Sequence, residues 1–195
     1  MLPFSYDVSS KKLKVTGDYA DLEYDIQQLN TLSGEILANK ADVPSPPSKE
    51  SFDKKLSHMA QKLHESAVSN IKTGKYPEAI KLLTTGLEMV NRRPKYESFQ
   101  MTLSEMTIFI VTRADAYMMN GDFEGAFNDA DLLVTLLPSI PDNYIRRGVA
   151  LFKMGRYVDA KNNFERGLSF DPDNAKLKKE LDFVLKKIDE ENGEL

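Results

Sequence analysis

One short pattern, in which a glycine is followed by an aromatic residue and then by an alanine, occurs three times in this chain. It spans residues 74–79, 121–126 and 155–160. The last two copies begin 34 residues apart, and a proline follows each at the same distance, at Pro138 and Pro172. A fixed period of this length is typical of a repeated helix-turn-helix unit. Because one unit cannot bury its apolar face alone, the pattern predicts a stack of such units, an α-solenoid.

Composition excludes several classes of protein. The chain has 195 residues, 41% hydrophobic and 29% charged, with a net charge of −4, as is ordinary for a soluble globular protein. The lack of a basic stripe disfavours nucleic-acid binding, and the lack of cysteine excludes disulfides and thiolate chemistry. Residues 1–5 lack the positive charge of a leader, and no run of about 18 to 20 apolar residues occurs. We therefore expect a cytosolic protein without direct membrane insertion.

The first 40 residues predict a small α+β module. Apolar and polar residues alternate between Phe4 and Val15, which is typical of a short β-hairpin. Apolar residues then recur every three or four positions from about Asp21 to Asn39, which predicts an amphipathic helix. A module of this size lies at the lower limit for independent folding. We therefore expect it to dock onto a neighbouring surface or onto a partner.

A proline-rich segment and a long helical region follow. Three prolines within four residues predict a linker, or a strap lying on the surface, over residues 41–50. Helical periodicity then predicts one repeat domain over residues 51–195. Its expected parts are repeats at about 60–93, 107–140 and 141–174 and a capping helix at about 174–190.

The first two copies of the glycine pattern are separated by 47 residues, so 13 residues are inserted relative to the period of 34. The insertion is expected to lengthen the helix that begins the second repeat. It can be a simple tolerated extension, but its apolar side chains favour burial under the N-terminal module or against a partner. These side chains are Tyr96, Phe99, Met101, Leu103, Met106 and Phe109.

The repeats resemble the tetratricopeptide repeat (TPR) family at its aromatic, small and proline positions. The third unit matches through Tyr144, Gly148, Leu151, Gly155, Tyr157, Ala160, Phe164, Gly167 and Pro172. The second matches through Ala114, Tyr117, Gly121, Phe123, Ala126 and Pro138, and the first through Ala67, Gly74, Tyr76, Ala79 and Gly86. The expected fold class is therefore all-α, with three TPR units, a C-terminal capping helix and the small N-terminal hairpin and helix module.

The TPR resemblance implies a concave groove lined by the first helix of each unit. Many TPR domains hold the acidic C-terminal tail of a heat-shock chaperone there with Lys, Asn and Arg side chains, the carboxylate clamp. The clamp positions of this chain are His64, Val68, Thr112, Asp142 and Arg146, of which only Arg146 matches. Asp142 would repel an acidic tail, so we expect a largely apolar groove that binds a partner segment. The candidate groove residues are His64, Val68, Ile71, Lys72, Val111, Thr112, Asp115, Met118, Ile145, Arg146, Val149, Phe152 and Lys153.

Several of these residues have a second interpretation. Arg146 can hold a peptide carboxylate or pair with Asp142, four residues earlier on the same helix. Lys72 and Lys153 can edge the groove or belong to a solvated face. The pair of methionines at 118 and 119 is more typical of core filling than of a binding surface.

The residues give no support to an enzyme or to a metal site. His58 and His64 are six residues apart, a poor spacing for two ligands on one helix face. The chain contains no phosphate-binding glycine loop and no nucleophile motif. The prediction is a non-enzymatic protein without cofactors.

The order of the parts resembles the soluble TPR subunit of the fungal post-translational translocation complex of the endoplasmic reticulum. The strings that carry this resemblance are Leu63-His64-Glu65-Ser66, Ala79-Ile80-Lys81, Arg146-Arg147 and Glu165-Arg166-Gly167-Leu168. It implies a peripheral adaptor on the cytosolic face of the membrane, with a membrane-anchored partner subunit and the J-domain translocation subunit as partners. It also implies docking of chaperones that deliver precursor proteins. The alternative is a soluble co-chaperone that binds the acidic tails of heat-shock chaperones.

Overall fold

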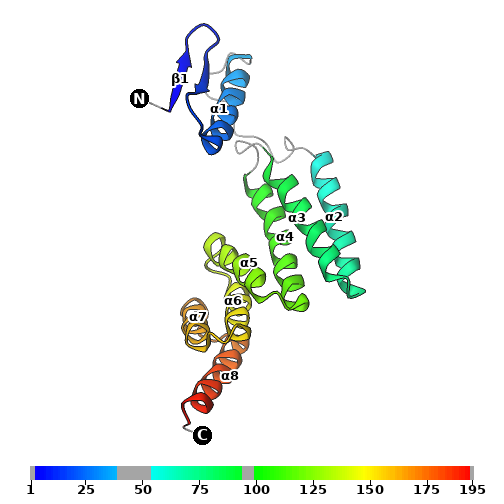
Figure 1. The fold of residues 1–195 in the computed structure, drawn as a ribbon, viewed down its shortest axis with the longest axis vertical. Coiled ribbons are helices and arrows are strands. Elements are labelled where there is room, and N and C mark those ends of the chain that lie inside the picture. Colours follow the sequence, from blue (N-terminus) through cyan, green and yellow to red (C-terminus); the bar gives the residue numbers. More distant parts are fainter. Residues whose placement is uncertain (1–2, 39–53, 94–98, 194–195) are drawn as a thin grey trace. The chain divides into compact units, whose positions relative to one another are not determined.

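The computed structural model describes residues 3–38, 54–93 and 99–193. In these residues it contains two strands and eight helices (Figure 1). The chain divides into two compact units, residues 1–53 with 92–102 and residues 54–91 with 103–195. The predicted linker at 41–50 lies outside the described residues, so the predicted domain boundaries stay a prediction.

The N-terminal unit begins with an antiparallel hairpin of β1 (Phe4–Asp7) and β2 (Lys12–Val15). Phe4 lies opposite Val15 and Tyr6 opposite Leu13. The turn is held by Asp7, whose Oδ1 accepts hydrogen bonds from the Ser9 backbone N–H at 2.9 Å and the Ser9 hydroxyl at 2.6 Å. Such a side-chain bond two residues ahead favours a turn over a continued strand.

Helix α1 (Ala20–Ala38) packs against β2 and is fastened to it by Asn30. The Asn30 side chain accepts a hydrogen bond from the Leu13 N–H and donates one to the Leu13 carbonyl, both at 2.8 Å. Among residues 3–38, Ile26 is the only buried residue. The module therefore has a very small core, as its length predicts.

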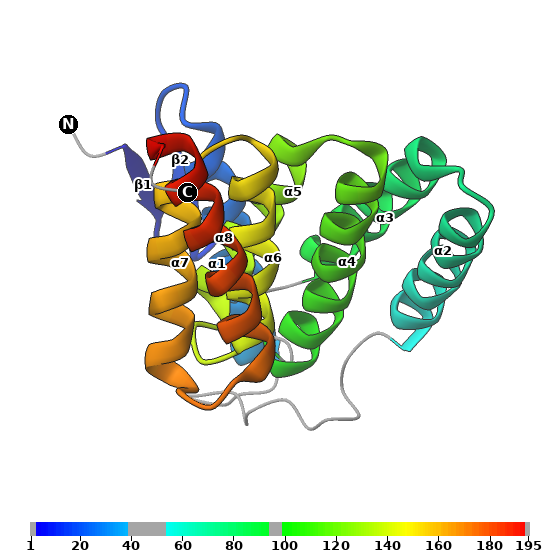
Figure 2. The same ribbon diagram turned by 90° about the horizontal axis from the view of Figure 1, so that it is seen from below.

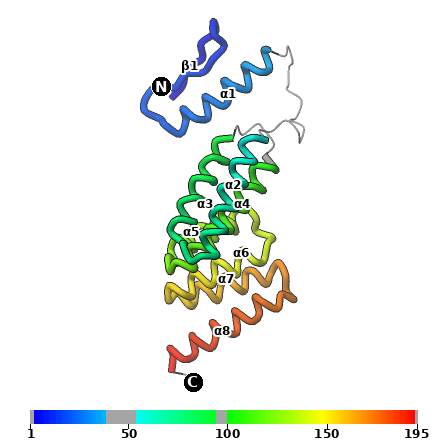
Figure 3. The backbone as a smooth tube through the Cα atoms, turned by 90° about the vertical axis from the view of Figure 1, so that its right-hand side faces the viewer, coloured from blue at the N-terminus to red at the C-terminus, as the bar shows by residue number. Residues whose placement is uncertain are grey.

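The second unit consists of successive helical hairpins. Their helices are α2 (Lys54–Lys72), α3 (Tyr76–Asn91), α4 (Phe99–Asn120), α5 (Phe123–Leu136), α6 (Pro141–Lys153), α7 (Tyr157–Phe170) and the capping helix α8 (Ala175–Asn192). Figure 2 shows α6, α7 and α8 side by side, and Figure 3 follows the chain from α2 to α8. The predicted fold class is confirmed.

The turn inside each hairpin requires glycine. Gly74, Gly121 and Gly155 have φ angles of 74°, 78° and 75°, a left-handed conformation that residues with a Cβ adopt at a cost. The repeated glycine of the sequence pattern therefore marks a repeated backbone geometry. Each glycine ends the first helix of its hairpin and lets the second return beside it.

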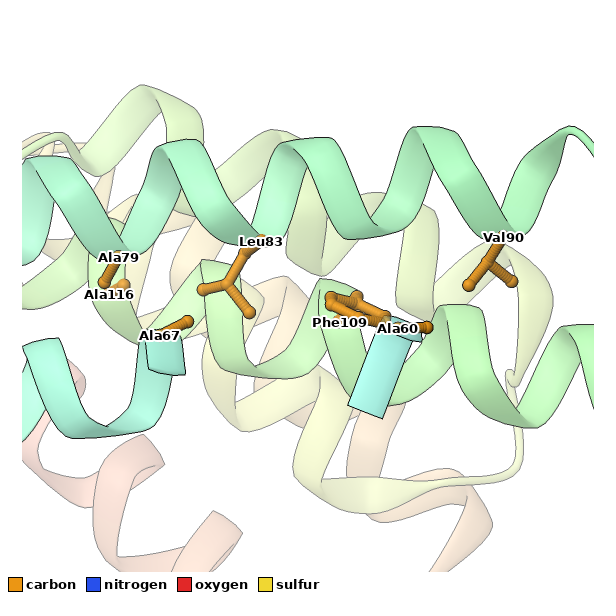
Figure 4. Close-up of a cluster of buried hydrophobic side chains, with 7 residues drawn as sticks. All are labelled: Ala60, Ala67, Ala79, Leu83, Val90, Phe109 and Ala116. Atoms are coloured by element: carbon orange, nitrogen blue, oxygen red, sulfur yellow. The ribbon is translucent and has the colours of Figure 1, made fainter. Parts of the chain in front are cut away.

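Helices α2, α3 and α4 share one hydrophobic cluster (Figure 4). Small residues let the helices approach closely, and larger side chains from α3 and α4 fill the space between them. The buried members are Ala60, Ala67, Ala79, Leu83, Val90, Phe109 and Ala116. Met106 packs against the cluster, and Phe109 is buried within it. For these two residues of the insertion, burial against α2 and α3 replaces the expected burial under the N-terminal module or a partner.

A second cluster joins α5, α6, α7 and α8. The side chains of Tyr144 and Phe164 are its largest fully buried members. Gly148 leaves room for the Phe164 ring where α6 crosses α7. The buried members are Val134, Tyr144, Leu151, Ala160, Phe164, Leu177 and Val184.

A buried ion pair joins the helices on which the two clusters are built. Arg113 of α4 donates from Nε to Asp129 Oδ2 at 2.8 Å and from Nη2 to Asp129 Oδ1 at 2.7 Å. Its Nη1 donates to the hydroxyl of Thr84 on α3 at 3.0 Å. One guanidinium therefore links α3, α4 and α5 with the two-pronged geometry that makes arginine pairs strong and directional.

Candidate peptide-binding groove

The candidate groove residues all lie on α2, α4 and α6, the first helices of the three repeats. Lys72 and Lys153 are exposed, and the other eleven residues are half-buried. Ile71 packs against the first hydrophobic cluster, whereas Ile145, Val149 and Phe152 pack against the second. These four side chains therefore support the core as well as contributing to the surface.

Arg146 has a partner that the sequence did not indicate. Its Nε donates to Oδ1 of Asp115 on α4 at 3.0 Å, and its Nη2 lies 3.5 Å from Oδ2. The expected alternative, a pair with Asp142, is wrong, because Asp142 lies 3.8 Å from the Lys176 ammonium of α8. The Arg146 and Asp115 side chains keep 26% and 47% of their exposure. A pair this exposed contributes about 0 to 1 kcal/mol, so a ligand carboxylate can compete for Arg146.

His64 and Thr112 occupy two clamp positions and bind each other. The distance between His64 Nε2 and Thr112 Oγ1 is 2.9 Å. Because the Thr112 hydroxyl donates to the Ile108 carbonyl at 2.8 Å, it accepts from His64, which assigns the ring hydrogen to Nε2. The ring also meets Phe109 edge-on, with centroids 5.7 Å apart. Neither residue is free to reproduce the clamp chemistry without breaking this contact.

A shallow hollow of about 430 Å³ runs along α2. It brings together the predicted residues His64, Val68 and Lys72 and adds Glu65 and Ser69. Glu65 and Ser69 were not among the predicted residues, although they are four apart on α2 and share a face that adjoins His64 and Val68.

The other end of the candidate surface is aromatic. The Phe152 ring lies 5.1 Å from Tyr157 and 5.1 Å from Phe183 of α8, between ring centroids. Phe183 is 56% exposed and was not among the predicted residues. It lies outside the apolar stripe of α8, which consists of Leu177, Leu181, Val184, Leu185 and Ile188. The sequence signal that could have identified Phe183 is an aromatic residue on the capping helix outside its buried stripe.

The remaining predicted residues are Val111 and Met118, which are half-buried on α4. The neighbouring Met119 is 57% exposed. Core filling is therefore the wrong interpretation for Met119.

No cluster of three or more His, Cys, Asp or Glu side chains in residues 3–38, 54–93 and 99–193 has the arrangement of a metal site. Within the same residues, no helix combines the length and the apolar character needed to cross a bilayer.

The hydrogen-bonded histidine gives the fold a pH dependence. Burial lowers the pKa of His64 below the ordinary histidine value. The unfolded chain therefore takes up this proton at a higher pH than the folded chain, and stability falls as the pH drops below the ordinary value. Between about pH 7.5 and about pH 5.5, the melting temperature of His64→Gln is expected to fall less than that of the unmodified chain. His58→Gln is the matched control, and equal falls in both variants would contradict the assignment.

A family model and several known proteins match this chain. The tetratricopeptide repeat model matches residues 141–174. Translocation protein SEC72 of Saccharomyces cerevisiae is 28% identical, with 100% of both chains covered. The ER protein translocation subcomplex subunit sec67 of Schizosaccharomyces pombe is 30% identical over 64% of this chain and 64% of its own length.

Solved structures agree with these matches. A chain in the cryo-EM structure of the Sec complex from Saccharomyces cerevisiae has a TM-score of 0.72 and 26% identity, covering 97% of this chain and 99% of that chain. The first TPR of Spaghetti (RPAP3), bound to an HSP90 peptide, has a TM-score of 0.52 and 30% identity, covering 66% and 94%. The chain is therefore a tetratricopeptide-repeat protein, and its predicted resemblance to the TPR subunit of the fungal translocation complex is confirmed.

Proposed function

We propose that this chain is a non-enzymatic adaptor subunit of the post-translational translocation complex, on the cytosolic face of the endoplasmic reticulum membrane. The observation that carries the proposal is the similarity to yeast SEC72 along both whole chains, together with the TM-score of 0.72 to a chain of the yeast Sec complex. Similarity over the full length includes the N-terminal module as well as the repeats. The partners are a membrane-anchored subunit and the J-domain subunit.

The hairpin supplies a surface for the membrane-anchored subunit. Phe4 and Tyr6 alternate along β1, and Val8 follows in the turn; their side chains are 39%, 57% and 77% exposed. Phe4 and Tyr6 therefore project from one face of the strand, while Ser5 projects from the other. Exposed apolar side chains gathered on a module with a single buried residue favour docking onto a partner.

Co-purification tests this function. The tagged chain is expressed in Saccharomyces cerevisiae lacking SEC72, and the Sec complex is isolated from detergent-solubilised membranes through its Sec63 subunit. We expect the chain to be recovered with the complex, and Tyr6→Glu to reduce that recovery because it places a charge in an apolar contact. Ser5→Glu, on the opposite face, is the matched control. Recovery only as a free soluble protein would contradict the proposal.

The groove provides a second function, the docking of chaperone tails. Spaghetti (RPAP3) has been solved with the HSP90 peptide SRMEEVD. In this chain Arg146 is the one clamp position with a matching side chain, and Asp115 already occupies it. Binding of an acidic tail then requires the tail to replace Asp115.

Titration with the peptide SRMEEVD measures this competition. We expect an affinity in the micromolar range that Arg146→Ala weakens about tenfold or more, since a charge-assisted hydrogen bond is lost. Asp115→Asn is expected to strengthen binding, because it frees Arg146 and removes a repelling carboxylate. Lys178→Ala, an exposed site on α8, controls for the change in net charge. An affinity that is unchanged in Arg146→Ala would leave the groove to an apolar partner segment.

A further inference from the structure

A second surface of the repeats carries a cationic hollow that the groove does not include. It has a volume of about 250 Å³ and lies between α5, α6 and α7. The residues that matter for its chemistry are Phe127, Arg147, Leu151, Arg156, Asn163 and Arg166. Two neighbouring arginines of α6 serve the two surfaces, since Arg146 reaches α4 in the groove whereas Arg147 reaches α5 and α7.

Arg147 is held rigidly at the floor of this hollow. Its Nε donates to Asn163 Oδ1 at 2.7 Å, and its Nη1 donates to Asp131 Oδ1 at 2.7 Å. Asn163 is itself fixed, because its Nδ2 donates to the Tyr144 carbonyl at 2.6 Å. The Nη2 of Arg147 has no acceptor among the residues the structure describes. A guanidinium fixed in this way loses little conformational freedom when it binds an anion.

Two further arginines lie at the rim. Arg156 contacts a single oxygen of Asp159, with distances of 2.8 Å from Nε and 2.7 Å from Nη2 to Oδ2, and lies 5.8 Å from the centroid of the Phe127 ring. Arg166 is exposed and forms no ion pair with the described part of the chain. Three guanidinium groups and one carboxylate line the hollow, and the Asp131 carboxylate pairs with Arg147 beside it, so the site keeps a net positive charge of +1 in a chain of net charge −4.

We propose that this hollow binds an acidic peptide segment of a protein partner, one with Glu or Asp side chains around an apolar side chain. The carboxylates pair with Arg147 and Arg166, and the apolar side chain lies on Phe127. Carboxylates suit this hollow because its hydrogen-bond donors are guanidinium groups, which bind carboxylates in a two-pronged geometry. A membrane surface is disfavoured because recognition of anionic lipids takes clusters of about 4 to 8 Lys or Arg side chains, more than line the hollow.

The probe is a fluorescent peptide, Glu-Glu-Leu-Phe-Glu-Glu, with an amidated C-terminus. It lacks the terminal carboxylate that a clamp in the groove would hold, so it reports on the α5–α7 surface. Using fluorescence anisotropy with the full chain, we expect saturable binding that Arg166→Gln weakens about tenfold, the loss of a charge-assisted bond. Two control variants are expected to leave binding unchanged. Lys161→Gln makes the same change in charge on the same helix, and Arg146→Ala alters the groove.

A peptide with Gln in place of Glu is expected to bind at least about tenfold more weakly. Equal binding of both peptides, or equal losses in Arg166→Gln and Lys161→Gln, would overturn the site. A loss in Arg146→Ala would transfer the binding to the groove and also overturn it. The proposal is also overturned if vesicles rich in phosphatidylserine bind the chain through Arg166 and the peptide does not compete with them. Circular dichroism of each variant confirms that the helices are intact, and the proposed membership of the translocation complex is unaffected by any of these outcomes.

Discussion

Replacing Asp129 with alanine is expected to lower the free energy of unfolding of the repeat unit by about 3 kcal/mol. The Asp129 side chain is 7% exposed and that of Arg113 is 15% exposed, so the substitution leaves a largely buried guanidinium whose remaining hydrogen-bond partner is the neutral Thr84 hydroxyl. A buried charge without its counterion is costly because protein atoms solvate it poorly. Chemical denaturation followed by helical circular dichroism measures the change.

The matched control for Asp129 is Asp159→Ala on α7. Asp159 also pairs with an arginine, but the two side chains are 48% and 52% exposed, so we expect a loss below about 1 kcal/mol. The double variant Arg113→Met with Asp129→Leu is expected to recover much of the stability, since no unpaired charge remains. Equal losses of stability in Asp129→Ala and Asp159→Ala would show that the buried pair contributes no more to the free energy of unfolding than the exposed pair.

Gly148→Ala is expected to destabilise the repeats by about 2 kcal/mol, although alanine normally favours a helix over glycine by about 1 kcal/mol. A Cβ at this position would overlap two atoms of the Phe164 ring and would lie 2.6 Å from Asn163 Nδ2. Phe164 is fully buried, so its ring cannot move aside without opening the second cluster. Thermal unfolding should detect the loss as a lower melting temperature.

Gly34→Ala is the control with the opposite sign. Gly34 lies within α1, and among the residues that the structure describes no neighbouring atom lies within 4 Å of the position its Cβ would take. The substitution is therefore expected to stabilise α1 by up to about 1 kcal/mol, measured as slower hydrogen exchange of its amides. If Gly148→Ala were stabilising as well, close packing of α6 on α7 would not be the reason for glycine at position 148.

The arrangement of the helices was predictable because local geometry repeats with the sequence. Gly74, Gly121 and Gly155 impose the same turn, and small residues such as Ala67 and Ala79 mark where helices touch. These features depend on residues close in the chain, so period and residue type suffice to locate them. The N-terminal hairpin was predictable for the same reason, from alternation over a few residues.

Contacts between helices of different repeats were not predictable in this way. Helical phase placed Arg146 on the groove face, but its pairing with Asp115 depends on how α6 stacks on α4, 31 residues away along the chain. The contact between His64 and Thr112 and the position of Phe183 beside Phe152 depend on the same stacking. Helical periodicity along the chain therefore indicates which residues face the groove, but it does not determine their partners on other helices.

The Asn30 amide has a consequence for solubility. A strand at the edge of a sheet offers unpaired backbone groups to any other extended chain, which promotes aggregation. Asn30 takes up both the N–H and the carbonyl of Leu13 on the outer edge of β2, much as a third strand would. A single side chain thus protects this two-stranded sheet against uncontrolled strand addition along β2.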